Sequence, residues 1–184
     1  MKQFKIFYSW QSDLPNKRNR NIIDSCIKKA VAKCNKFVKG FEIVSDRDTQ
    51  GVTGSPNISE TIFSKIDECD LFIADVSIVS SYTVKQNPNT ENDINDNLEN
   101  DDKSSDLSFE NAKKKYTPNP NVLIELGYAV KCLGWNRVIC LINTDYGDIE
   151  QLPFDLEHQR VTAYNLDDTE RTKKQYQILL LILF

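Results

Sequence analysis

The strongest constraint on the fold of this chain is a repeated alternation of short apolar segments with segments of helical periodicity. The apolar segments are short and end in polar or glycine-rich stretches, as buried strands do. They are residues 5–9, 41–44, 71–76, 137–143 and 160–164. Strands that alternate with helices favour right-handed crossovers and a parallel sheet. The sequence therefore predicts an α/β fold that is doubly wound around a five-stranded parallel sheet.

The segments between the expected strands carry helical patterns. Residues 16–38 place apolar side chains on one face and Lys and Arg on the other, and Gly40 is a suitable residue to end that helix. A second helix begins near Ser55 or Asn57, either of which can cap it. A third helix covers residues 118–133. We expect one domain over residues 1–166, followed by a C-terminal helix at 167–184 that is either truncated or binds a partner.

Residues 79–117 differ from the rest of the chain, because they are rich in Asn, Asp, Ser and Lys. We interpret them as a polar insertion, either a solvated surface loop or a disordered excursion. Much of the net charge of −4 lies there, since residues 85–115 contain eight acidic and five basic residues. The rest of the chain, with nineteen acidic and eighteen basic residues, is almost neutral. That balance argues against a nucleic-acid partner, which would require a basic face.

Several other protein classes are excluded by composition. No apolar run approaches the roughly 20 residues needed to span a bilayer, so we expect no membrane partner. The N-terminus lacks the apolar segment of a secretory signal. The five cysteines form no CxxC pair and the chain has one histidine, His158, which argues against a disulfide scaffold and a zinc site. We therefore expect a cytoplasmic protein that holds no metal.

Glu125 is the most informative residue of the sequence. It lies in a segment that is apolar almost all round, where an unpaired carboxylate is costly to desolvate. Asn121, Glu125 and Tyr128 share one helical face by their spacing. This face either lines a polar cleft or holds Glu125 against a buried Arg or a neighbouring element. We favour the cleft, because perturbed buried carboxylates gather at functional sites.

The loops that follow the strands supply further candidates, because ligands of doubly wound sheets bind beyond the carboxyl ends of the strands. Ser9, Trp10 and Gln11 surround the end of the first strand, and Ser77 follows the third. The Trp10 indole is suited to stacking on a flat heterocycle, although it can equally cover the edge of the core.

Residues 46–56 form a further candidate loop. Arg47 and the backbone amides of this glycine-containing loop can hold phosphate oxygens, and we include Asp48 and Gly51 among the substrate-binding candidates. A plain surface turn explains the same residues. The loop matches neither the GxxxxGK[ST] nor the GxGxxG pattern, so a P-loop and a dehydrogenase-type dinucleotide fold are both unsupported.

The search for a nucleophile favours chemistry that depends on a carboxylate. There is no Gly-x-Ser-x-Gly elbow, and Cys69 and Cys132 fall on apolar helix faces. A single carboxylate without a metal cluster suits the cleavage of an N-glycosidic bond, whose transition state resembles an oxocarbenium ion.

Four segments then resemble a known superfamily in their residues, order and spacing. KIFYSWQSD, DRDTQG, DLFIADVS and NVLIELGYA are similar to motifs of Toll/interleukin receptor (TIR) domains, above all bacterial TIR-like proteins of anti-phage defence. The likeness covers residues 4–164. It implies a flavodoxin-like sheet and an enzyme that cleaves NAD at the nicotinamide–ribose bond, with NAD as substrate and no separate cofactor.

The resemblance also implies roles for individual residues. Glu125 falls at the position of the catalytic glutamate and would stabilise the positive charge that develops on the ribose. Trp10 would stack near the nicotinamide, and Ser9, Gln11 and the loop around Arg47 would hold the rest of the dinucleotide. Such domains also assemble with one another, which implies a homo-oligomer.

Two alternatives remain open. The NVLIELGYA segment also resembles nucleoside 2-deoxyribosyltransferases, in which a glutamate attacks the sugar covalently. A non-catalytic TIR scaffold that acts by self-association is the second, and in that case Glu125 would be structural.

Overall fold

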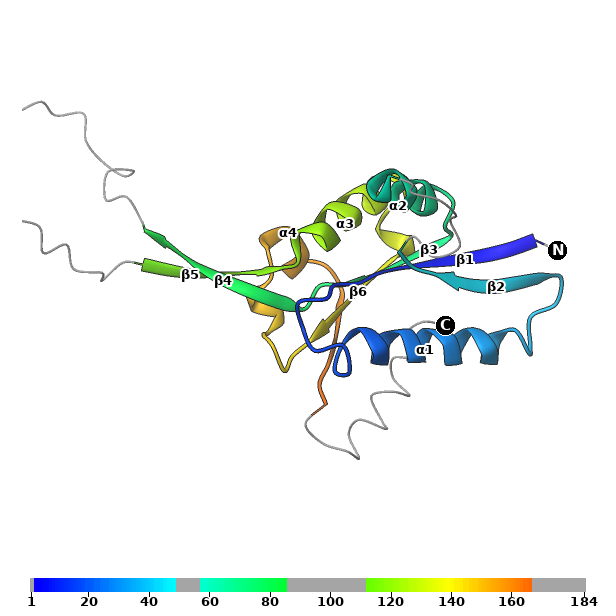
Figure 1. Cartoon of the computed structure of the whole chain (residues 1–184), viewed down its shortest axis with the longest axis horizontal. Helices are drawn as coiled ribbons and strands as arrows, with labels where there is room; N and C mark the ends of the chain where they lie inside the picture. Colours follow the sequence, from blue (N-terminus) through cyan, green and yellow to red (C-terminus); the bar gives the residue numbers. More distant parts are fainter. Residues whose placement is uncertain (1, 49–56, 86–111, 167–184) are drawn as a thin grey trace, which may run out of the picture.

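The sheet of this protein has five strands, all parallel to their neighbours. The structure, a computed structural model, describes residues 2–48, 57–85 and 112–166. The strands are β1 (Lys2–Ser9), β2 (Phe41–Asp46), β3 (Leu71–Asp75), β6 (Val138–Asn143) and β7 (Val161–Tyr164). Their order in the sheet is β2-β1-β3-β6-β7 (Figure 1). This is the flavodoxin-like order of a doubly wound fold, which confirms the predicted fold class.

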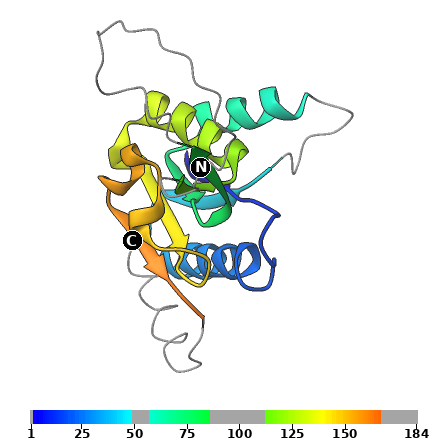
Figure 2. The same ribbon diagram turned by 90° about the vertical axis from the view of Figure 1, so that its left-hand side faces the viewer.

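Helices cover both faces of the sheet (Figure 2). The longer ones are α1 (Arg20–Cys34), α2 (Ile58–Asp67) and α3 (Pro120–Leu133), and the short ones are η2 (Trp135–Arg137), η3 (Ile149–Gln151) and α4 (Phe154–Glu157). Helix α1 lies on one face, whereas α2 and α3 lie side by side on the other. Each face has its own apolar cluster of buried side chains.

The two clusters follow from the spacing of apolar residues. On α1, Ile23, Cys26, Ile27 and Ala30 are buried at intervals of three and four residues. On α3 the buried residues recur in the same way, and they are Val122, Leu126, Ala129 and Leu133. The segment around Glu125 is not buried all round as expected, however, because Ile124 is 59% exposed.

Helix α1 is shorter than the periodicity predicted. The helix ends at Cys34, and Asn35 follows as its C-terminal cap. The side-chain amide of Asn35 donates to the carbonyl oxygen of Ile43 and accepts from its N–H, both at 2.8 Å. This pair of bonds joins the end of α1 to β2, so Gly40, at φ +95°, serves the turn into β2 rather than the helix end.

A two-stranded antiparallel ribbon was not predicted. It consists of β4 (Ile78–Lys85) and β5 (Ala112–Pro118), which flank the central part of the polar insertion and extend away from the body (Figure 1). The ribbon lacks the alternation of a half-buried strand, because Ser80, Ser81 and Thr83 are exposed. At its base, Ile78 is buried in the cluster under α2 and α3.

The expected C-terminal helix at 167–184, most of the loop at 46–56 and the middle of the insertion lie outside the described residues. Within the described ranges, no helix has the length and apolarity needed to cross a bilayer.

Candidate active site

The carboxyl edge of the sheet carries a polar residue at the end of four neighbouring strands. These residues are Ser9, Asp46, Asp75 and Asn143, the last residues of β1, β2, β3 and β6. Side chains alternate between the two faces of a strand, so neighbouring positions along this edge point to different sides of the sheet. Ser9 follows Phe7 on the face under α2 and α3, whereas Asp75 follows Ile73 on the face of α1.

Glu125 contacts the end of β1. The Ser9 hydroxyl donates to Oε2 of Glu125 at 2.5 Å, a short distance typical of a hydroxyl bound to a carboxylate. Ser9 is buried and Glu125 is half-buried. The contact joins residues 116 positions apart, so it depends on the packing of α3 against the sheet. Ser9 and Glu125 are thus the two predicted site residues that the structure brings together directly.

Burial sets the ionisation of Glu125. Desolvation raises the pKa of this carboxyl above its ordinary value, and the hydrogen bond from Ser9 partly offsets that rise. Within the described residues no Lys, Arg or His forms an ion pair with Glu125. Its Oε1 also accepts no hydrogen bond from the described residues. One carboxylate oxygen is therefore held in place by the protein, whereas the other has no hydrogen-bond donor among the described residues.

A second buried carboxylate, Asp75, is saturated with hydrogen bonds. Its Oδ1 accepts from the N–H of Ser77 at 3.1 Å and from the Ser77 hydroxyl at 2.6 Å. Its Oδ2 accepts from the side-chain amides of Asn19 at 2.8 Å and Gln11 at 3.3 Å. Asn143 completes the group by donating its N–H to the Ser77 hydroxyl and its amide to Asn19. These five residues, which we call the Asp75 cluster, are all fully buried or nearly so.

The Asp75 cluster holds three loops at the carboxyl edge of the sheet. Its members come from the loop after β1, the start of α1, and the ends of β3 and β6. Desolvation raises the pKa of Asp75, and the bonds from Ser77, Asn19 and Gln11 oppose that rise. Because every oxygen of Asp75 is occupied by the protein, the cluster organises the edge and offers no carboxylate to a ligand. Gln11 and Ser77, both predicted to bind substrate, belong to this group.

Trp10 lies on the α1 side of the sheet, where it packs against the apolar cluster. The guanidinium of Arg20 lies 4.4 Å from the centre of its ring, a cation–π contact. The structure therefore does not bring Trp10 to Glu125.

Arg47 and Asp48 follow the end of β2. The guanidinium of Arg47 faces the carboxylate of Asp24 on α1, with Nε 3.8 Å from Oδ1. Asp48 has a positive φ of 44°, a conformation that Asp adopts in turns. Gly51 lies outside the described residues.

Asn121 and Tyr128, predicted to share a helical face with Glu125, have different surroundings in the structure. Asn121 is exposed in the first turn of α3. The Tyr128 hydroxyl donates to the carboxylate of Asp67 at 2.8 Å, and its ring lies 4.6 Å from that of Phe63 on α2. Tyr128 therefore joins α3 to α2.

Two buried cysteines, Cys69 and Cys140, lie away from the carboxyl edge of the sheet. Burial raises the pKa of the Cys69 thiol to about 11 and that of Cys140 to about 12, so both stay protonated at neutral pH. The described part of the chain contains no group of three or more His, Cys, Asp or Glu side chains placed to hold a metal.

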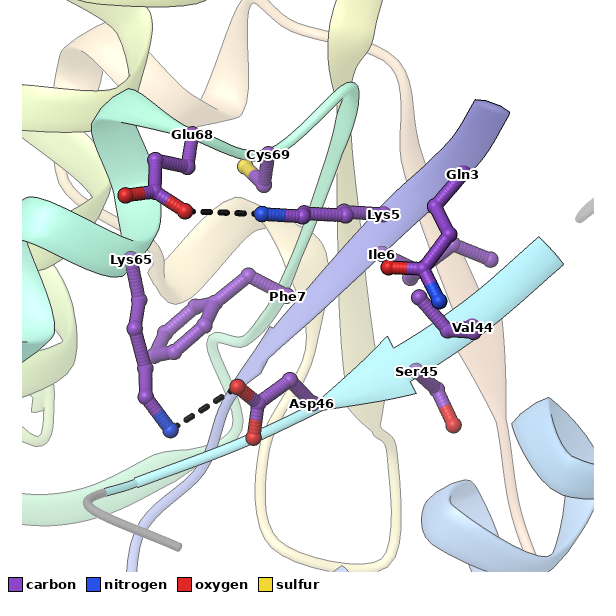
Figure 3. Close-up of a pocket in the computed structure, with 10 residues that line it drawn as sticks. All are labelled: Gln3, Lys5, Ile6, Phe7, Val44, Ser45, Asp46, Lys65, Glu68 and Cys69. Atoms are coloured by element: carbon purple, nitrogen blue, oxygen red, sulfur yellow. Dashed lines mark hydrogen bonds and ion pairs between the residues drawn. The ribbon is translucent and has the colours of Figure 1, made fainter. Parts of the chain in front are cut away.

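A hollow of about 330 Å³ opens between β1, β2 and α2 (Figure 3). Its wall carries two ion pairs, Lys5 with Glu68 at 2.7 Å and Lys65 with Asp46 at 2.8 Å. The remaining lining residues are Gln3, Ile6, Phe7, Val44, Ser45 and Cys69. The hollow lies on the same face of β1 as Ser9, but neither Ser9 nor Glu125 lines it.

Four polar residues of this edge have no role predicted from the sequence above. They are Asp13, Asn19, Asn119 and Asn143. The available signals were local: Asn143 ends an apolar strand, and Asn119 precedes Pro120 where a helix cap is expected. Their partners lie more than 50 residues away along the chain, which periodicity does not reveal.

Comparisons with known proteins add a likeness to solved structures. No family model matches this chain, and no curated protein matches it. Among solved structures, the chain is similar to the CMP N-glycosidase BcmB of Clostridium botulinum, with 14% sequence identity and a TM-score of 0.45. The alignment covers 98% of this chain and 99% of that protein. The fold assignment rests on the strand order described above.

Proposed function

We propose that this chain cleaves an N-glycosidic bond, with Glu125 as the catalytic carboxylate. The observation that carries the proposal is the state of Glu125 at the carboxyl edge of the sheet. It is half-buried, held through one oxygen by Ser9, and without a cationic partner among the described residues. An isolated, desolvated carboxylate costs stability, and such groups are characteristic of functional sites.

The chemistry follows from the charge of the transition state. When the bond between the sugar C1′ and the base nitrogen breaks, the electron pair leaves with the base and the sugar ring becomes positive. Oε1 of Glu125 is free to stabilise that charge or to form a bond with C1′. Water or another acceptor then takes the place of the base at C1′, and in the covalent route this step releases the carboxylate.

The Ser9 hydroxyl supports this role in two ways. It fixes the orientation of the carboxylate, and it lowers the pKa of Glu125 against the effect of burial. The ionised form is the active one in either route. Activity is therefore expected to rise with pH as Glu125 ionises, around a pKa above the ordinary value of 4.5.

The substrate divides into two classes. The resemblance to TIR domains supports NAD, whose nicotinamide is a cationic leaving group. The resemblance to nucleoside 2-deoxyribosyltransferases supports a nucleoside or nucleotide, with base exchange or hydrolysis as the outcome. A single catalytic carboxylate can act on either class of substrate. The proposed reaction class therefore rests on the geometry of Glu125, and the proposed substrates rest on the two resemblances.

The test is a product analysis with a matched variant. The full chain is incubated separately with NAD, with CMP, and with a pyrimidine deoxynucleoside together with a second free base as acceptor, and the products are measured by mass spectrometry. Glu125→Gln keeps an acceptor for Ser9 and removes the charge. We expect its turnover to fall by about 100- to 1,000-fold, the loss typical when a preorganised electrostatic group is removed. Circular dichroism checks that the variant remains folded.

The outcomes separate the alternatives. Nicotinamide release from NAD supports the NAD-cleaving class, and base exchange on the deoxynucleoside supports the transferase class. Full activity of Glu125→Gln would contradict the assigned catalytic residue. A wild-type chain that releases no base, including at concentrations that promote self-association, would reject the enzyme and favour the scaffold.

A further inference from the structure

Asn119 uses both ends of its side-chain amide. Its Oδ1 accepts from the N–H groups of Asn121 at 2.8 Å and Val122 at 3.3 Å, which caps the N-terminus of α3. Its Nδ2 donates to Oδ2 of Asp13 at 2.6 Å. An amide oxygen only accepts and an amide nitrogen only donates, so the two contacts together fix the orientation of Asn119.

Asp13 is anchored to the sheet from its other side. The Oε1 atom of Gln11 accepts from the N–H groups of Asp13 at 2.6 Å and Leu14 at 3.0 Å. The Nε2 atom of Gln11 donates to the buried Asp75. Gln11 is only 2% exposed, so the backbone around Asp13 is held by a group that cannot easily move. The Asp13 carboxylate is therefore a fixed point for Asn119 to contact.

The contact between Asp13 and Asn119 spans the same two segments as the contact between Ser9 and Glu125. Asp13 lies four residues after Ser9, just beyond β1, and Glu125 lies six residues after Asn119, on α3. Apolar packing already holds α3 against the sheet, and the two polar contacts act at different points of it, one at its N-terminal cap and one at Glu125. Two contacts at different points along the helix restrict both its translation and its rotation.

We propose that Asp13 and Asn119 form a positioning pair that sets the placement of Glu125 against Ser9. Neither residue acts on the substrate in this proposal, which rests on the proposed function of Glu125. Asp13 is exposed and Asn119 half-buried, so their hydrogen bond by itself adds little to stability. Its effect is on the placement of Glu125 relative to Ser9. Catalysis is sensitive to such placement, since a displacement of about 1 Å can lower the rate about 100-fold.

Substitutions at position 119 separate the bridge from the helix cap. Asn119→Ser and Asn119→Asp both keep an acceptor suited to an N-cap, but neither keeps the amide donor. Asn119→Asp also places a second carboxylate against Asp13. The matched control is Asn57→Ser, because Asn57 caps α2 through the same Oδ1 contacts, to Ser59 at 3.1 Å and Glu60 at 3.4 Å.

The expected kinetic result is a loss of kcat with little change in KM. We expect Asn119→Ser to lower kcat by about tenfold and Asn119→Asp by more, because the carboxylates repel each other, whereas Asn57→Ser leaves kcat unchanged. In a Ser9→Ala background, Asn119→Ser should have little further effect, since both substitutions act on the same contact. Asp13→Asn should lower kcat less than Asn119→Ser does and leave KM unchanged, because the Asn side chain retains an oxygen that can accept from Asn119.

A second measurement does not depend on turnover. The Glu125 carboxyl is titrated by NMR in the wild type and the variants, and Glu125→Gln assigns its signal. Loss of the Ser9 contact should raise the pKa of Glu125 in Asn119→Ser, in the same direction as in Ser9→Ala. If the wild type has no activity, the proposed function fails and this titration still decides the positioning role.

Two results would overturn the positioning role. One is that Asn119→Ser changes neither the pKa of Glu125 nor kcat. The other is an increase in KM for Asp13→Asn with no coupling to Asn119→Ser, which would show that Asp13 contacts the substrate directly.

Discussion

Glu125 and Asp75 are both carboxylates that burial makes harder to ionise, yet their surroundings differ. Asp75 accepts four hydrogen bonds from Ser77, Asn19 and Gln11, on the α1 face of the sheet. From the part of the chain that the structure describes, Glu125 accepts one, from Ser9, on the opposite face. The first carboxylate is fully used by the fold, whereas the second keeps unused hydrogen-bonding capacity.

The difference shows that burial alone does not identify a functional carboxylate. A raised pKa is common to both residues, so it does not distinguish them. What distinguishes them is how many of their acceptor positions the protein fills. A saturated group stabilises loops, and an unsaturated one is available to a ligand.

The largest effect on stability is expected from Asp75→Asn, which replaces the saturated carboxylate with its amide. In Asp75→Asn, one acceptor oxygen becomes an NH₂ group that faces two hydrogen-bond donors. Each buried donor left without an acceptor lowers the free energy of unfolding by about 1–3 kcal/mol. Relief of the buried charge offsets part of this cost. We expect a net loss of about 3 kcal/mol, or about 6–12 °C in Tm, by differential scanning calorimetry. An unchanged Tm would mean that the Asp75 cluster rearranges freely.

The hydrogen bond that Ser9 donates to Glu125 should matter for activity as well as for stability. Ser9→Ala removes a donor to a charged group, which is worth about 1.5–3 kcal/mol. We expect kcat/KM to fall by at least about tenfold and the acid limb of the pH–rate profile to move to higher pH, because the pKa of Glu125 rises further. The shift is measured against Ser9→Thr, which retains a hydroxyl. Equal profiles for Ser9→Ala and the wild type would contradict this role.

The smallest expected effect is a gain in stability from Glu125→Gln. A carboxyl whose pKa is raised in the folded protein favours folding below its unfolded pKa, and this contribution is lost as pH rises through the folded pKa. The variant should therefore match the wild type near pH 4 and exceed its stability at pH 7, within the range of about 0.5–2 kcal/mol for stabilising substitutions. Urea unfolding at both pH values measures the difference in the free energy of unfolding between Glu125→Gln and the wild type. A difference that becomes smaller from pH 4 to pH 7 would contradict the prediction.

The sheet was predictable because its signals are local. The five apolar segments and the helical faces of α1, α2 and α3 repeat within short windows, and the carboxyl edge follows from parallel strands. The ribbon of β4 and β5 was missed because neither strand alternates apolar and polar residues over a core. Five residues of β4 are of types that favour strands, but the polar composition of the segment that follows them outweighed this signal; they are Ile78, Val79, Tyr82, Thr83 and Val84.

The site was predictable only in part, for a related reason. Glu125 stood out because its segment is otherwise apolar, and the contact with Ser9 agrees with the expected strand edge. The shared face of Glu125 and Tyr128 suggested a common cleft, but the neighbouring α2 supplies Asp67 and draws Tyr128 to itself. The Asp75 cluster depends on contacts between residues 56 to 124 positions apart, and no local pattern specifies them.

The ribbon has a consequence for how this architecture tolerates variation. Ile78 is paired with Pro118, so the chain departs from the body and comes back at adjacent points of the rim, between Asp75 and Asn119. Lengthening or replacing residues 86–111 would therefore leave the spacing of those two residues unaltered. Segments of different length or sequence can therefore be carried at this point of the sheet edge while α3 keeps its place.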